Sequence, residues 1–252
     1  NVLRPQSRIA LLRSDVYSCK EIIVVDAETQ GDLRVIAEAV KDLGSKIMPC
    51  GSAGLAEEVS SLMRPKRKGV LVVSGSINNV TLNQISVAER ILGVSIMETD
   101  LVRALRSDRD LKLEAERVVN EAETALRDHE DLIITLTRNR GNLIEAYSHY
   151  RRLGMGYSDL AKNALTLLSR IFKLIISRFS FSGLILIGGD TTSHILKSAG
   201  SYGIRLGREV MAGIPVGRVL GGELDGIPII TKAGGFGDEN AIVKAIKYMK
   251  EG

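Results

Sequence analysis

The sequence of 252 residues contains no tryptophan, 4% aromatic residues and two cysteines. With so few rings to stack on bases, the composition argues against nucleic acid as a partner. Cys19 and Cys50 stand apart from any Cys-x-x-Cys or Cys/His cluster, which argues against a disulfide scaffold or a zinc site and favours reduced thiols in the cytoplasm. No apolar run reaches the roughly 18–20 residues that cross a bilayer, so we expect no membrane partner.

Sequence motifs of several well-known enzyme sites are also absent. There is no GxxxxGK[ST] phosphate loop, no GxGxxG followed by an acidic residue about 20 positions later, no GxSxG and no HExxH. The three histidines, His129, His149 and His194, are scattered, and the first two are expected at the surface or at a helix end. Any site must therefore be built from other residues.

What the sequence does contain is typical of a folded α/β protein. Hydrophobic residues make up 44% of the chain and charged residues 25%, with a net charge of +4, and the length allows one large domain or two smaller ones. Short apolar runs alternate with amphipathic stretches, which predicts a Rossmann-like three-layer α/β/α fold with a mostly parallel or mixed sheet. The predicted strands are residues 21–25, 46–49, 69–74, 95–98, 131–136 and 183–187.

Long helices are predicted where apolar residues recur at helical spacing. They cover residues 111–130, 158–179, with Ser158 or Asp159 as the N-cap, and 237–250. The stretch 206–233 differs, because glycines and two prolines interrupt its β-branched residues, and we expect a β-hairpin or a mixed-sheet edge there. A seam between two strand–helix groups is predicted at residues 61–69.

Four places share one design, in which an apolar strand runs into a loop of small residues that opens a helix. Glycine lets the backbone approach a ligand closely, and the free N–H groups at a helix start attract anions. In an open α/β sheet such loops gather at the carboxyl ends of the strands, where ligands bind. One such loop is weak support, but four in one chain favour a phosphate or nucleotide site. The four are MPCGSAGLAEEV, VVSGSINNVTLNQI, ILIGGDTTSHIL and TKAGGFGDENAI.

Asp190, which follows Gly188 and Gly189, is the best-placed candidate for a catalytic group. At a helix N-terminus its carboxylate could cap the helix, hold a water bound to Mg²⁺ or orient the acceptor of a phosphoryl group. Lys232 could neutralise a phosphate, or it could be a lysine at the solvent end of a strand.

Three further residues are weaker candidates. Asp26 follows the strand predicted at 21–25, and Asp225 lies in the expected hairpin turn. His194 comes four residues after Asp190, so it either faces the site or packs or caps within its own helix.

Several segments of the chain occur in an order that identifies a family. They are VVDAETQGDLRVIAEAV with CGSAGLAEEV, VVSGSINNVTLNQI, IGGDTTSHIL and AGIPVGRVLGGELDGIPIITKAGGFGDENAI. Together they resemble the four-carbon acid sugar kinase family. The resemblance spans about Ile22 to Met249, and the combination is specific although each piece alone is not.

The resemblance implies a two-domain α/β kinase, in which an N-terminal domain binds the acid sugar and a C-terminal domain binds ATP. Residues 1–65 resemble the last part of the sugar-binding domain, and residues 66–252 resemble the nucleotide-binding domain. Family members carry an acidic DDxTGA motif after their first strand, and this sequence, which opens on Asn1, contains none. We therefore expect either a fragment of a longer kinase or a short product that binds ATP without its acceptor site.

By the same resemblance, the substrates are ATP, accompanied by Mg²⁺, and a small sugar acid such as threonate, erythronate or an oxo-tetronate. Adenine is expected near the hairpin region at 206–233, and neither the metal ligands nor the catalytic base is identified. The residues expected at the nucleotide are Ser76, Gly188, Gly189, Asp190, Thr191, Gly234 and Gly235, with Lys232 beside them.

Two other functions are compatible with these loops. The missing acidic motif favours a non-catalytic module that binds a nucleotide or a phosphosugar. A sugar-phosphate isomerase is a third reading, although the few histidines offer it no clear base. As a further partner we expect a second copy of the chain, in a homo-oligomer, or a missing N-terminal segment.

Overall fold

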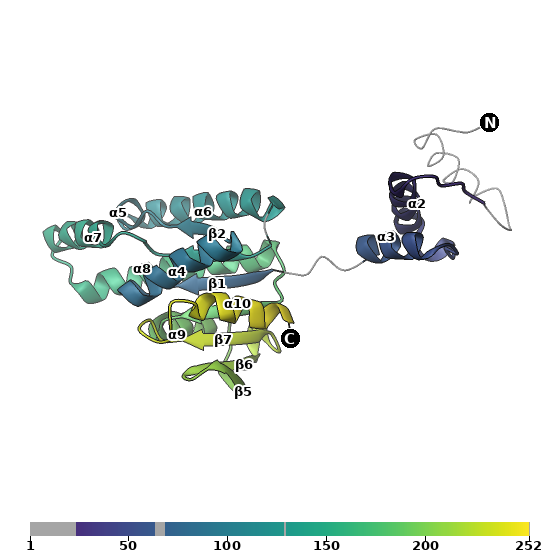
Figure 1. Ribbon diagram of the computed structural model, residues 1–252. Coiled ribbons are helices and arrows are strands. Elements are labelled where there is room, and N and C mark those ends of the chain that lie inside the picture. The colour runs from purple at the N-terminus through teal and green to yellow at the C-terminus, as the bar shows by residue number, and fades with distance from the viewer. Residues whose placement is uncertain (1–23, 64–68, 129, 252) are drawn as a thin grey trace. The chain divides into compact units, whose positions relative to one another are not determined.

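The computed structural model describes residues 24–63, 69–128 and 130–251, and the chain divides into two compact units, Asn1–Lys66 and Arg67–Gly252 (Figure 1). Among the described residues, no helix is both long and apolar enough to cross a membrane. The described part of the first unit is helical, and the second unit contains the sheet.

In the first unit, helix α2 (Gln30–Leu43) packs against helix α3 (Ala53–Met63), and the short 3-10 helix η1 (Gly44–Lys46) follows α2 in the chain. Thr29 caps α2 through a reciprocal pair of hydrogen bonds. The backbone N–H of Asp32 donates to the Thr29 hydroxyl at 3.2 Å, and the backbone N–H of Thr29 donates to the Asp32 carboxylate at 3.0 Å. This cap sets the start of the helix.

The prediction of a strand at residues 46–49 is wrong. Of the strand predicted at 21–25, the structure describes only residues 24 and 25, and these form no strand. The residues after η1 and those before α2 have no regular structure, while residues 21–23 lie outside the described part. A strand forms only when a neighbour satisfies its backbone hydrogen bonds, and the described residues of this unit include no such neighbour.

The second unit is built on a sheet of seven strands in the order β2-β3-β1-β4-β7-β6-β5. The strands from β2 to β7 in this order run parallel, and β6 and β5 pair antiparallel at one edge. The strands are β1 (Val70–Ser74), β2 (Ser95–Glu98), β3 (Leu132–Thr135), β4 (Gly183–Ile187), β5 (Gly203–Met211), β6 (Ile214–Leu220) and β7 (Pro228–Lys232). The strands predicted in this unit and its antiparallel edge are thereby confirmed.

Helices cover both faces of the sheet, which confirms the predicted three-layer α/β/α fold (Figure 1). Leu71 and Val73 of β1 pack with α5 to α9, whereas Val70 and Val72 pack with α4 and α10, because successive strand residues point to opposite faces. Covered on both sides, β1 is buried along its whole length. The helices are α4 (Asn79–Leu92), α5 (Leu101–Ala104), α6 (Asp108–Asp128), α7 (Arg140–Arg152), α8 (Tyr157–Arg178), α9 (Gly189–Ser198) and α10 (Ala241–Glu251), with the 3-10 helix η2 (Gly222–Leu224) before β7.

The three predicted long helices correspond to α6, α8 and α10, but the N-cap predicted for α8 is wrong. Helix α8 begins at Tyr157, with Gly156 in the N-cap position. Asp159 lies in the first turn, where its carboxylate accepts a hydrogen bond from the backbone N–H of Gly156 at 2.8 Å. An acidic side chain that reaches back in this way lets a glycine serve as the N-cap.

Helix α10 is tied to the amino ends of two strands. The ammonium group of Lys250 donates to one oxygen of the Asp131 carboxylate at 2.9 Å, and the other oxygen accepts from the backbone N–H of Val70 at 2.9 Å. Asp131 directly precedes β3, and Val70 begins β1. With Ile242 and Ile246 in the core, α10 forms one helical layer together with α4.

Candidate functional site

The carboxyl ends of β1 and β4 meet where the chain leaves the sheet toward opposite faces. Strand β1 continues into α4 on one face, while β4 continues into α9 on the other. In open α/β sheets a crevice forms outside such a switch point, and ligands commonly bind in it. Strand β7 ends beside β4, so three of the glycine loops noted in the sequence lie together at the carboxyl ends of neighbouring strands.

A cavity of about 450 Å³ lies beside these strand ends. Small-molecule sites typically measure about 300–1,000 Å³, so its size suits a ligand such as a nucleotide. The loop after β1 and the start of α9 form one side, and α5, α7, α8 and Leu136 form the other. The residues expected at the nucleotide that line this cavity are Ser76, Gly188, Gly189, Asp190 and Thr191.

The loops after β1 and β4 approach each other so closely that they require glycine. A Cβ on Gly75 would lie 2.1 Å from the Thr191 hydroxyl oxygen, and Gly188 has a φ of +105°, which side chains rarely allow. The backbone N–H of Gly188 donates to the carbonyl oxygen of Lys232 at 2.8 Å. The glycines thus let two loops and the end of β7 converge on one small space.

The loop after β7 is joined to the loop after β1 by hydroxyl groups. The Thr81 hydroxyl donates to the Gly234 carbonyl at 2.6 Å and lies 3.1 Å from the Ser76 hydroxyl. A Cβ on Gly234 would lie 2.2 Å from that same Ser76 oxygen, and a Cβ on Gly235 would lie 3.7 Å from the Asn78 amide nitrogen. The structure therefore places Gly234 beside Ser76 and Gly235 beside Asn78.

Lys232, the last residue of β7, has only 3% of its surface exposed. Burial lowers the pKa of its ammonium group to about 8, because the charged form loses its water. Its Nζ donates to the carbonyl oxygens of Ala233 and Gly234 at 3.0 and 3.3 Å, and no carboxylate pairs with it within the described part of the chain. The reading of Lys232 as a solvent-facing strand end is therefore wrong, and its desolvated charge can attract an anionic ligand.

Asp190 does not cap α9, contrary to one of the roles considered for it. The helix begins at Gly189, with Gly188 in the N-cap position and no side chain bonded to the cap. Asp190 lies in the first turn, exposed and lining the cavity. Its carboxylate has no hydrogen-bond or ion-pair partner among the residues that the structure describes, so it is available to a ligand or a metal ion.

Gln84, a buried residue of α4, holds the loop after β7. Its side-chain amide donates to the carbonyl oxygens of Phe236, Gly237 and Asp238 at 3.0, 3.2 and 2.7 Å. Sequence reasoning missed this residue, because a helical glutamine is ordinary until the loop it binds is known.

We expect Gln84→Leu to lower the free energy of unfolding by about 1–3 kcal/mol, because the loop carbonyls lose their shared donor. Asn83→Leu, on the exposed side of the same helix turn, is the matched control and should change it by less than about 0.5 kcal/mol. Urea denaturation followed by circular dichroism measures both. Equal effects of the two substitutions would contradict the role given to Gln84.

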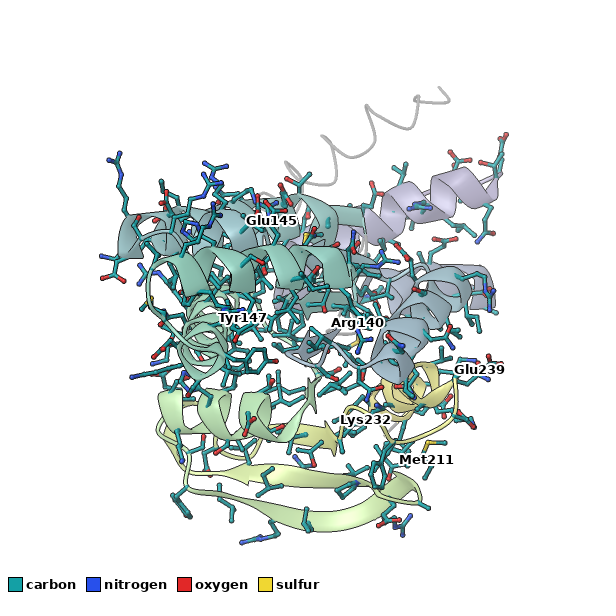
Figure 2. All side chains as sticks on the ribbon, turned by 90° about the vertical axis from the view of Figure 1, so that its left-hand side faces the viewer. Arg140, Glu145, Tyr147, Met211, Lys232 and Glu239 are labelled. Atoms are coloured by element: carbon teal, nitrogen blue, oxygen red, sulfur yellow. The ribbon has the colours of Figure 1, made fainter. Side chains whose placement is uncertain are left out.

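The side of the cavity formed by α7 and α8 was also missed. Arg140, the first residue of α7, brings a positive charge to the cavity, and Tyr157, the first residue of α8, brings an aromatic ring. Figure 2 looks onto the strand ends, with Arg140 on the α7 side and Lys232 on the β7 side of this face. A signal was present, since TLTRNRGN, which runs from the end of β3 into the start of α7, is a further polar segment with a glycine between a strand and a helix.

The weaker candidates lie elsewhere. His194 is on α9 but does not line the cavity. The Asp225 carboxylate accepts a hydrogen bond from the backbone N–H of Gly221 at 2.6 Å, so it stabilises the turn before β7. Asp26 and the loop MPCGSAGLAEEV belong to the first unit.

Cysteine and metal chemistry find little support in the described residues. Cys50 has an exposed free thiol, and Cys19 lies outside them, as does His129. Within the described ranges, no three His, Cys, Asp or Glu side chains come together in a group that could hold a metal ion.

Two family models match the chain. The family described as a nucleotide-binding C-terminal domain matches residues 71–242, and the family described as a sugar-binding N-terminal domain matches residues 4–59. Both lie within the same chain, in the order in which their names place them.

Curated relatives include a D-threonate kinase of Salmonella typhimurium strain LT2, 31% identical over 247 residues, and a D-erythronate kinase of Heliobacterium modesticaldum, 27% identical over 237 residues. These alignments cover 96% and 91% of this chain but only 57% and 54% of the relatives. The chain thus spans little more than half the length of the kinases that it matches.

Among solved structures, the chain is similar to a domain of unknown function from Bordetella bronchiseptica, a domain swapped dimer with bound citrate. The TM-score is 0.59 at 25% identity, covering 96% of this chain and 57% of that one. A protein from Haemophilus influenzae, at 19% identity and a TM-score of 0.58, shares the fold. With the family match over most of the second unit and kinases of two C4 acids as relatives, the chain belongs to the four-carbon acid sugar kinase family.

Proposed function

We propose that this chain contains the nucleotide-binding part, and a portion of the sugar-binding part, of a kinase that transfers the terminal phosphoryl group of ATP to a four-carbon sugar acid. The observation that carries this proposal is the convergence of three glycine loops and the buried Lys232 at the switch point of the sheet. The names of the D-threonate and D-erythronate kinases among the relatives support the class of acceptor.

The glycine loops suit the phosphates of ATP. The first N–H groups of α9 have no partners within the helix, and the positive end of the helix dipole lies there. Gly188 and Gly189 carry no side chain that would keep a phosphate away from this backbone. Lys232, at the end of the neighbouring strand, adds a positive charge to the same region.

Asp190 fits a Mg²⁺ ion that arrives with ATP. Mg²⁺ is usually held by one or two carboxylates together with phosphate oxygens and water, and Asp190 supplies a carboxylate at the cavity. When bound, the ion neutralises the charge that develops on the transferred phosphoryl group. Alternatively, Asp190 accepts the proton of the acceptor hydroxyl as its oxygen attacks the phosphorus.

We assign residues 1–65 to the acid-sugar-binding domain and residues 66–252 to the nucleotide-binding domain. The two family matches and the division between Lys66 and Arg67 support this assignment. The domain swapped dimer of the Bordetella structure supports a homo-oligomer, and ATP as a substrate supports a cytoplasmic location.

Calorimetric titration with ATP and Mg²⁺, followed by an assay of phosphate transfer to D-threonate and D-erythronate, tests the proposal. We expect ATP to bind at or below about 1 mM, as is usual for enzyme substrates, and at least one acid to be phosphorylated. Failure to bind ATP would overturn the proposal. Binding without transfer would favour a nucleotide-binding module without an acceptor site, and phosphosugar binding without ATP binding would favour an isomerase.

A further inference from the structure

The cavity at the switch point has two chemically different ends. Ser76, Asp190 and the glycine backbone form the polar end. The opposite end is formed by helices α7 and α8 and by the residue after β3. Apart from Arg140 and Tyr157 at the starts of the two helices, its side chains are apolar: Leu136, Leu143, Leu160, Ala161, Ala164 and Leu165. A ligand that fills the whole cavity must therefore change from polar to apolar along its length.

The wall formed by α8 is recessed because two of its cavity-lining residues are alanines. Ala161 and Ala164 lie one helical turn apart, so their short side chains leave room on the same face of the helix. Leu160 and Leu165 flank them and keep the recess apolar. A recess of this kind suits a flat ring system that buries carbon on both faces.

Neither a triphosphate nor a sugar acid has a part that matches this apolar end. Both are polar throughout, and placing their oxygens against leucine and alanine side chains would remove water without replacing its hydrogen bonds. A nucleotide has the required order of groups, with charged phosphates at one end and an aromatic base at the other.

We propose that the apolar end of the cavity, between α7 and α8, binds the purine base of the nucleotide, with Arg140 at its rim. This inference rests on the proposed function and specifies its nucleotide site. It differs from the position near the hairpin expected from the sequence, since no residue of β5 or β6 lines this cavity.

The α8 wall that contains Ala161 and Ala164 contributes little to discrimination between one purine base and another. Ala161 and Ala164 lie inside α8, where backbone N–H and C=O groups are used by the helix, and Leu160 and Leu165 beside them are aliphatic. Because the alanines of this wall offer no hydrogen bonds to a base, discrimination between adenine and guanine would fall to Arg140 and Tyr157, which also line the cavity.

The test is to fill the recess and to compare a ligand that has a base with one that has none. Ala161→Trp places a large side chain in the cavity, and Lys162→Trp, at the exposed neighbouring position of the same helix, is the matched control. Each variant is titrated with ATP and with inorganic tripolyphosphate, in the presence of Mg²⁺. Ala161→Leu, a smaller change, provides a second variant in case the tryptophan disturbs folding.

We expect Ala161→Trp to weaken ATP binding about 30-fold or more, to change tripolyphosphate binding by less than about threefold, and Lys162→Trp to change neither by more than that. The loss of ATP affinity in Ala161→Leu should be smaller than in Ala161→Trp but larger than in the Lys162→Trp control. Unchanged ATP binding in both Ala161 variants, or equal losses for the two ligands, would place the base elsewhere and overturn the inference. If the wild-type chain binds tripolyphosphate but not ATP, the base site fails while a phosphate site stands; if it binds neither, the proposed function fails as well.

Discussion

Replacing Lys232 with methionine is expected to weaken ATP binding by about 10- to 100-fold, which corresponds to the loss of a charged hydrogen bond to phosphate. The ligand-free protein should be at least as stable as the wild type. In the wild type, the buried ammonium has given up water and received two backbone carbonyls in exchange, whereas methionine fits an apolar strand without that desolvation. Titration calorimetry and urea denaturation measure the two effects.

The pH dependence of both quantities follows from the pKa of Lys232, which burial lowers from 10.5 to about 8. Between these values the unfolded chain binds more protons than the folded one, so the wild type should gain stability relative to Lys232→Met as the pH rises from about 8 to 10.5. ATP binding requires the charged form, so wild-type affinity should fall as the pH rises above about 8, and the variant should lack this decline.

Lys247→Met is the control for the change in net charge, because Lys247 is an exposed residue of α10. It should leave ATP binding and its pH profile unchanged. If Lys232→Met binds ATP as tightly as the wild type, Lys232 serves only to hold the loop carbonyls, and its part in the nucleotide site is withdrawn.

Gly189→Val is expected to reduce ATP binding by about 100-fold or more while changing the free energy of unfolding by less than about 1 kcal/mol. A Cβ at this position meets no protein atom within 4 Å, so the fold has room for the side chain. The added methyl groups instead occupy the cavity at the start of α9, where the phosphates are proposed to bind. Affinity is measured by calorimetry and stability by urea denaturation.

The choice of Gly189 rather than Gly188 makes this result easy to interpret. Valine at Gly188, with its φ of +105°, would strain the backbone whatever the ligand does. Gly31→Val is the matched control, since Gly31 lies in the first turn of α2 and a Cβ there makes only an ordinary contact with Thr29. Wild-type affinity in Gly189→Val would mean that no phosphate approaches this backbone.

The central sheet could be predicted from the sequence because its signals are local. Strands β1 and β4 are short runs that are apolar apart from Ser74, and burial on both faces demands that pattern. The run at 46–49 has apolar residues, Ile47 and Met48, between Lys46 and Pro49 but forms no strand, since strand formation depends on a partner that composition does not reveal. The apolar pattern therefore identified strands correctly only where neighbouring strands are present to pair with them.

The candidate site divides in the same way. Its glycine loops were recognised because tight turns and free helix N–H groups depend on neighbouring residues in the chain. The α8 wall of the cavity was not recognised, since Ala161 and Ala164 resemble ordinary helix residues in the sequence. Their role depends on the packing of α7 and α8, which leaves a space beside them. Lys232 stayed ambiguous for a related reason, because burial decides its chemistry and burial is a property of the folded sheet.

The attachment of α10 to the sheet, through the hydrogen bonds that Lys250 and Val70 donate to Asp131, has a consequence for how the protein is made. The central strand β1 leaves the ribosome before the other six strands of the described sheet, yet one of the two helices that cover its second face is α10, which follows all seven in the chain. Until α10 emerges, a nascent chain carries a half-covered sheet whose apolar face is open to other molecules. Synthesis that stalls shortly before Ala241 should therefore yield a product that depends on chaperones, although all seven strands are already complete.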